Sequence, residues 1–143
     1  CLIHGVMITK SHAGNGYGMH VDNPYMPSGR SDLSFTLFLN DPEEYEGGSL
    51  CIQTINETKQ IKLSAGEMII YPSTQLHSVS QVKKGERFVC VGWIQSYVQN
   101  NEDRNFLFGL DAGAKGLLAK HGRSDELDLI FQAYSNLLRR LGD

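Results

Sequence analysis

The chain has 143 residues, of which 41% are hydrophobic and 20% are charged, and its formal net charge is −3. This length suits one domain with a buried core, and the acidic balance gives no electrostatic reason to expect binding to nucleic acid or to an anionic membrane. No apolar run approaches the length of a membrane span, and three widely spaced cysteines favour free thiols and a cytoplasmic location.

A β-rich region comes first. From Leu2 to about Tyr97, short β segments alternate with Gly, Pro, Asn and Asp, which is typical of an all-β sandwich or barrel. Eight candidate strands favour two packed sheets over one open sheet, and the sequence between them, including Lys83-Lys84-Gly85, has turn chemistry. These strands are Ile3–Lys10, Tyr17–Val21, Asp32–Leu39, Ser49–Gln53, Lys59–Leu63, Met68–Tyr71, His77–Val82 and Arg87–Ser96. Because a strand pattern begins directly after Cys1, we expect that upstream sequence has been removed.

The pattern becomes helical after Tyr97. Phe106 to Leu118 fits a helical stripe whose middle is weakened by Gly109 and Gly113. Ser124 has the character of an N-cap, and apolar residues then recur at three- and four-residue steps up to Leu141. We therefore predict a mainly β jelly-roll core over residues 1–97, and a helical extension of the same domain over residues 98–143 that packs outside the β unit.

A metal-binding pattern lies within the β region. In a strand, residues two apart point to the same side, so His20 and Asp22 share a face. His77 lies far along the chain and joins them only if the chain folds back, as it does in a jelly-roll. Two imidazoles and one carboxylate on one face of a metal ion form the arrangement of non-haem Fe(II) oxygenases.

Simpler interpretations of the same residues remain open. In the interpretation without a metal, His20 and Asp22 form a hydrogen-bonded pair at the surface, and His77 is an ordinary strand residue. Zinc is a competing metal, although closed zinc sites need four ligands and only three are in view. His4, His12 and His121 are interpreted as surface or packing residues.

Arg87 begins a largely apolar candidate strand and shares a face with Val89, Val91 and Trp93. A charge on a buried face is costly unless it meets an anion, so Arg87 is a candidate clamp for a substrate carboxylate. The alternative is that Arg87 reaches solvent at the strand end.

Several stretches resemble the prolyl-4-hydroxylase-like branch of the Fe(II)/2-oxoglutarate dioxygenases, and in particular the PKHD-type hydroxylases. The resemblance extends in order over nearly the whole chain. It is carried by Tyr17–Asn23, Arg30–Leu39, Tyr45–Leu50, Leu63–Glu67, Tyr71–His77, Trp93–Ser96 and Asn136–Arg139.

The resemblance implies a double-stranded β-helix in which His20, Asp22 and His77 bind Fe(II) and Arg87 binds 2-oxoglutarate. It further implies O₂ as co-substrate, ascorbate as a reductant, and hydroxylation of a C–H bond, with peptidyl proline as the default substrate. Related halogenases have a small residue in place of Asp22, so a carboxylate there favours hydroxylation. Thr36, Phe38 and Trp93 are candidates for the pocket lining or, equally, for ordinary core.

The sequence departs from the family pattern in two places. The resemblance implies a helical N-terminal segment that these 143 residues do not include, and Ser11-His12 stands where many relatives have a tyrosine that helps to hold the co-substrate. The polar loop Asn23–Ser31 is either a lid over the metal or an inert connection.

Two other functions compete with hydroxylation of a peptide or small molecule. Nucleic-acid demethylases of the superfamily have a second arginine six positions after the clamp, where this chain has Trp93. A non-catalytic cupin-like metal-binding protein is the other, and a complete ligand set together with Arg87 argues against it.

Overall fold

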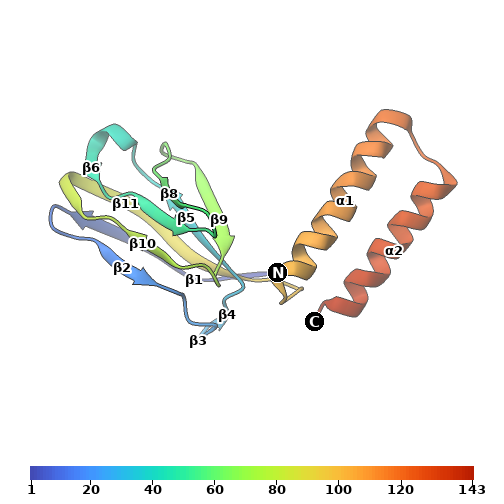
Figure 1. Ribbon diagram of the computed structural model, residues 1–143. Helices are drawn as coiled ribbons and strands as arrows, with labels where there is room; N and C mark the ends of the chain where they lie inside the picture. The colour runs from blue at the N-terminus through green and yellow to red at the C-terminus, as the bar shows by residue number, and fades with distance from the viewer. The chain divides into compact units, whose positions relative to one another are not determined.

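The computed structural model describes residues 1–143. The chain forms two compact units, Cys1–Gln95 and Ser96–Asp143. The first unit is built of antiparallel strands and the second of two helices (Figure 1).

The larger sheet of the first unit has the order β1-β11-β5-β9, and a short strand, β6, also pairs with β11. Its strands are antiparallel to their neighbours. They are β1 (Leu2–His12), β5 (Leu33–Phe38), β6 (Tyr45–Gly47), β9 (Met68–Pro72) and β11 (Val82–Gln95).

The smaller sheet has the order β2-β10-β7-β8 and is also antiparallel. It consists of β2 (Tyr17–His20), β7 (Leu50–Gln53), β8 (Thr58–Ile61) and β10 (His77–Val79). A two-stranded hairpin, β3 (Tyr25–Met26) and β4 (Gly29–Arg30), and a short 3₁₀ helix, η1 (Pro42–Glu44), connect the sheet strands. The two antiparallel sheets confirm the predicted mainly β jelly-roll.

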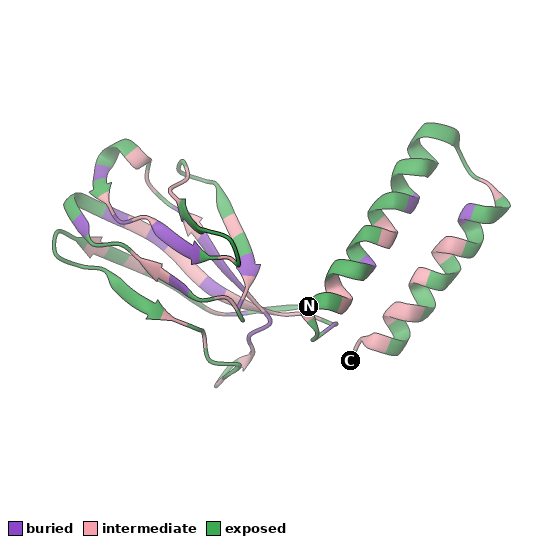
Figure 2. Cartoon of the chain, in the orientation of Figure 1, coloured by how far each residue is buried: buried purple, intermediate pink, exposed green.

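Apolar side chains from both sheets form the interior of the first unit. Phe38 and Val89 of the larger sheet and Leu50 of the smaller sheet are almost completely buried. Leu50 also clusters with Ile52 and Tyr71. In Figure 2 buried segments lie along the strands of this unit. Burial of this apolar area is the main force that holds the two sheets together.

The predicted turn at Lys83-Lys84-Gly85 is wrong. β11 runs without a break from Val82 to Gln95, and its first part pairs with β6, a strand that was not predicted from the sequence. Gly85 has a φ of +76° inside this strand, beside a register shift between Val82 and Lys84. A glycine with positive φ occurs at irregular positions within strands as well as in turns. The residue types Lys83-Lys84-Gly85 are therefore compatible with either structure.

The second unit contains α1 (Asn101–His121) and α2 (Asp125–Leu141), which pack against each other. The Asn100 side chain accepts hydrogen bonds from two backbone amides of the first turn of α1, and Ser124 caps α2 as predicted. Neither helix has an apolar stretch sufficient to cross a membrane.

The weakening expected at Gly109 and Gly113 does not interrupt α1. A glycine in a helix costs only about 1 kcal/mol relative to alanine, which the cap and the contacts with α2 offset. The packing of the helices outside the β unit stays a prediction.

Candidate functional site

The β strands bring the three predicted ligand residues together. His20 ends β2 and His77 begins β10, and these two residues are direct partners in the antiparallel pairing of the strands. Cross-strand partners place their side chains side by side, and the two imidazole rings are 4.2 Å apart between centroids. Asp22 lies two residues beyond His20, and one potential ligand atom from each of the three residues lies within 4.8 Å of the others.

Each histidine ring is held in one orientation by a hydrogen bond to the backbone carbonyl two residues earlier in the chain. The Nδ1 of His20 is 2.8 Å from the carbonyl oxygen of Gly18, and the Nδ1 of His77 is 2.9 Å from that of Gln75. Because a carbonyl only accepts, Nδ1 carries the proton in both rings. The Nε2 lone pair of each ring is therefore free to bind a metal, which is the usual arrangement of histidine ligands.

The two carboxylate oxygens of Asp22 have different neighbours. Its Oδ1 lies 3.4 Å from His20 Nε2 and 3.5 Å from His77 Nε2. Its Oδ2 accepts hydrogen bonds from Ser34 Oγ at 2.5 Å and from Trp93 Nε1 at 3.0 Å. The spacing around Oδ1 exceeds an ordinary hydrogen bond and leaves room for a metal ion with bonds of about 2.0–2.2 Å.

A cavity of about 320 Å³ opens between the two sheets at this cluster. Among the predicted lining residues, Thr36 and Trp93 border the cavity, whereas Phe38 does not. Phe38 has no exposed surface and lies beneath the Arg87 guanidinium, 5.8 Å from its ring centroid. Strand parity placed Phe38 on the correct face but could not show that Arg87 covers it.

Arg87 also borders the cavity, together with Val89, Val91 and Trp93 of the same strand face. The residue is only 4% exposed, and its Nε has no hydrogen-bond partner. Burial lowers the pKa of Arg87, and the neighbouring phenols of Tyr45 and Tyr71 oppose that effect. A buried cation with an unused donor suits an anionic ligand.

Two tyrosines near the site were not singled out from the sequence. Tyr71 borders the cavity and packs edge-on against His77, with ring centroids 5.1 Å apart. Burial raises the pKa of the Tyr71 phenol, and the negative charge of Asp22 raises it further. Tyr45 is buried on β6, and its hydroxyl makes no well-formed hydrogen bond, although it faces the Arg87 guanidinium. Burial raises the pKa of Tyr45, and the charge of Arg87 opposes this shift.

Ser34 and Ser73 were also missed. Ser34 precedes Thr36 by two residues on β5, so strand parity was a signal that could have identified it. Ser73 lies in the loop after β9, and its hydroxyl is 2.7 Å from that of Ser34. No local pattern indicates this contact, because it joins segments 39 residues apart.

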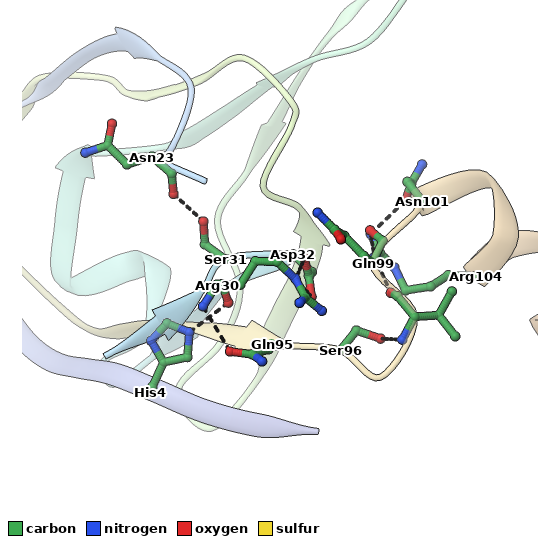
Figure 3. Close-up of polar contacts among 11 residues, drawn as sticks. His4, Asn23, Arg30, Ser31, Asp32, Gln95, Ser96, Gln99, Asn101 and Arg104 are labelled. Atoms are coloured by element: carbon green, nitrogen blue, oxygen red, sulfur yellow. Dashed lines mark hydrogen bonds and ion pairs between the residues drawn. The ribbon is translucent and has the colours of Figure 1, made fainter. Parts of the chain in front are cut away.

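The segment Asn23–Ser31 is anchored to the sheet at its C-terminal part. His4 Nδ1 lies 2.8 Å from Ser28 Oγ. His4 Nε2 lies 2.9 Å from the carbonyl oxygen of Arg30, a contact that Figure 3 shows. The backbone amide of Arg30 donates to Gln95 Oε1. His4 is thus a buried packing residue, while His12 and His121 are exposed, in agreement with their interpretation from the sequence. Its role as a lid or as an inert connection stays a prediction.

Comparisons with known proteins show the family of this chain. The family model of the 2OG-Fe(II) oxygenase superfamily matches residues 6–95. A PKHD-type hydroxylase of Prochlorococcus marinus strain NATL2A is 87% identical over 142 residues, and one of strain MIT 9211 is 75% identical over 141 residues. Each alignment covers 99% of this chain and 64% of the relative, so the chain spans about two-thirds of the length of these relatives.

Solved structures share the fold at low identity. A 2OG-Fe(II) oxygenase family oxidoreductase from Burkholderia pseudomallei has a TM-score of 0.55 at 21% identity, covering 64% of this chain and 43% of its own. A prolyl-4-hydroxylase from Pseudomonas putida has a TM-score of 0.54 at 22% identity, covering 63% of this chain and 51% of its own. Both likenesses concern the fold.

Proposed function

This chain belongs to the 2OG-Fe(II) oxygenase superfamily, and we propose that it acts as an Fe(II)- and 2-oxoglutarate-dependent hydroxylase. The reaction consumes 2-oxoglutarate, O₂ and a C–H bond, and yields succinate, CO₂ and an alcohol. One oxygen atom enters succinate and the other enters the product. The observation that carries the proposal is the convergence of His20, Asp22 and His77 beside the buried Arg87 in one cavity.

The three side chains fit ferrous iron as ligands. Two neutral imidazole nitrogens and one carboxylate oxygen leave further coordination positions open, as oxygenase chemistry requires. A closed zinc site would need a fourth ligand, and the cluster offers three. When bound, the iron and 2-oxoglutarate supply the activation of O₂, while the protein orients its ligands and excludes water.

Arg87 fits the far carboxylate of 2-oxoglutarate. Its guanidinium is planar and can bind a carboxylate through two parallel hydrogen bonds. The position is buried within an otherwise apolar strand face, so the pair would form with little competition from water. Ser11 also borders the cavity, where it offers a small hydroxyl instead of the tyrosine found in many relatives.

Peptidyl proline is the substrate class that we propose to test first. The naming of the P. marinus relatives as PKHD-type hydroxylases supports hydroxylation, and the proline default comes from the resemblance to prolyl 4-hydroxylases. Ascorbate is proposed as the reductant that keeps the iron ferrous, and the cytoplasm as the location, since all three cysteines are free.

A nucleic-acid demethylase is the rival from the same superfamily. Its second arginine would fall at Trp93, but here the indole of Trp93 donates a hydrogen bond to Asp22. The position is therefore occupied by a residue that serves the ligand cluster. The net charge of −3 gives no added support for a nucleic-acid substrate.

The test measures succinate and substrate oxidation together. The chain is loaded with Fe(II) without oxygen, supplied with 2-oxoglutarate, ascorbate and a panel of proline-containing peptides and metabolites, and then exposed to air. We expect succinate together with a product one oxygen atom heavier, both absent in His77→Ala. Succinate that never rises above the His77→Ala background across the panel would overturn the proposal and favour a non-catalytic metal-binding protein.

A further inference from the structure

Asp22 differs from the two histidines in how its position is fixed. His20 and His77 lie on paired strands of the smaller sheet, whereas Asp22 lies beyond the end of β2. A side chain at such a position is not held by a strand ladder. The hydrogen bonds that hold the carboxylate come instead from the opposite sheet.

The two donors to Asp22 Oδ2 are neighbours on the larger sheet. Ser34 on β5 and Trp93 on β11 are direct partners in the strand pairing. Their Oγ and Nε1 atoms therefore reach the same oxygen from adjacent strands. Because Ser34 is only 3% exposed, water does not compete for its hydroxyl.

Ser73 completes the arrangement. A hydroxyl has one proton, and Ser34 gives its proton to Asp22, so Ser34 must accept the hydrogen bond that joins it to Ser73 at 2.7 Å. Ser73 is also 3% exposed, and its backbone amide donates to the carbonyl oxygen of Asp32. The orientation of the Ser34 hydroxyl is therefore determined on both sides.

The indole of Trp93 packs against a glycine of β1, where no side chain fills the space beside the ring. Gly5 has a φ of +61° and lies where the pairing of β1 with β11 shifts register. A Cβ atom at this position would lie 2.6 Å from Cε3 of the Trp93 ring. Only glycine leaves space for the ring there, which supports a defined position for Nε1.

We infer that Ser34, Ser73 and Trp93 are positioning residues that hold Oδ2 of Asp22, so that only Oδ1 binds the metal. The inference rests on the proposed function. A carboxylate with both oxygens free can bind a metal through either or both, and a second bound oxygen would occupy a position that 2-oxoglutarate or O₂ needs. Hydrogen bonds from two donors to Oδ2 keep that position open.

The experiment measures metal binding directly. The affinity of the chain for Mn²⁺ is determined by competition with a metal-binding indicator for wild type, Ser34→Ala, Trp93→Phe and Ser73→Ala. We expect tenfold or greater weakening in Ser34→Ala and Trp93→Phe, in line with the 10–100-fold range for such outer partners, and a smaller loss in Ser73→Ala. Ser31→Ala is the matched control, because Ser31 is a buried serine whose hydroxyl donates to the Asn23 carbonyl and not to the Asp22 carboxylate.

A second readout separates positioning from a general structural role. The anaerobic Fe(II) form of each variant is titrated with 2-oxoglutarate, and the visible charge-transfer absorption of the chelate is followed. At saturating metal, we expect weaker 2-oxoglutarate binding in Ser34→Ala and Trp93→Phe, because the released Oδ2 competes for the open position. Ser31→Ala should match wild type in both titrations.

The outcomes distinguish the two proposals. If wild type binds neither Mn²⁺ nor Fe(II), the proposed function fails. If wild type binds both while Ser34→Ala and Trp93→Phe stay within twofold of it in both titrations, the positioning role is wrong. The substitutions lie on three different segments, so those variants that keep the wild-type circular dichroism spectrum decide the outcome.

Discussion

At the scale of single residues, the candidate site depends on which atom of each side chain faces the cavity. His20 and His77 present Nε2 because each donates Nδ1–H to a carbonyl two residues earlier. Asp22 presents Oδ1 because Oδ2 is occupied by hydrogen bonds. Arg87 retains an unused Nε donor. These atoms, more than the residue types, determine what the cavity can bind.

Replacing Arg87 by lysine should weaken 2-oxoglutarate binding by about tenfold to a hundredfold, because a lysine keeps the charge but loses the two-pronged geometry. Binding is measured by titrating the metal-loaded chain. Arg123→Lys, at an exposed ion pair with Asp128, is the control and should bind as wild type does. Pyruvate has no far carboxylate, so its affinity should not change in Arg87→Lys. An equal loss for both acids would contradict the clamp.

Replacing Tyr45 by phenylalanine should leave the ligand-free chain as stable as wild type, or more stable by about 1 kcal/mol. The Tyr45 hydroxyl is buried without a well-formed hydrogen bond, and such a group carries a desolvation cost of about 1–3 kcal/mol. Urea unfolding without metal or 2-oxoglutarate measures the change in the free energy of unfolding. A loss of more than 1 kcal/mol would show that the hydroxyl is satisfied in the folded protein.

At the scale of elements, β11 connects the parts of the site. It pairs with β1, β5 and β6, and it carries both Arg87 and Trp93. Its irregular first part requires close backbone approach to β6, where Gly47 has a φ of +74°. A Cβ atom on Gly47 would overlap the carbonyl oxygen of Gln81.

Gly47→Ala should therefore destabilise the β unit by about 1–3 kcal/mol or more, through backbone strain and the overlap with Gln81. Urea unfolding followed by circular dichroism measures the loss. Gly18→Ala is the control, because Gly18 lies on exposed β2 with no neighbouring atom within 4 Å of a Cβ. If the two variants unfold at the same urea concentration, the close approach of β6 to β11 is wrong.

At the scale of the whole molecule, the metal ligands all belong to the first compact unit. Metal binding should therefore stabilise the unit Cys1–Gln95. A ligand present at 100 times its dissociation constant stabilises the folded state by about 2.7 kcal/mol.

Adding Mn²⁺ should thus raise the unfolding temperature of the β unit, measured by the near-ultraviolet signal of Trp93, the single tryptophan of the chain. His77→Ala should abolish this shift. His12→Ala should retain it, because His12 is exposed and lies outside the ligand cluster. A shift that persists in His77→Ala would place the metal elsewhere in the protein.

Most of the β core could be predicted from the sequence, because strand alternation and turn residues are local properties. The helix N-cap at Ser124 was likewise recognisable. The short strands β3, β4 and β6 were not, since they contain only two or three residues each and exist through their partners. The turn predicted at Lys83–Gly85 was wrong because this segment is a strand through its pairing with β6.

The side chains available for metal and carboxylate binding could be recognised from local patterns along the chain, since His20, Asp22, His77 and Arg87 each stand in one. The direction in which their atoms point depends on how the strands pair and pack. The pairing of β2 with β10 places the imidazoles together, and Ser34 and Trp93 reach Asp22 from the other sheet. Hydrogen bonds between segments distant in sequence leave no periodic signal along the chain, so these contacts emerge only once the sheets have packed.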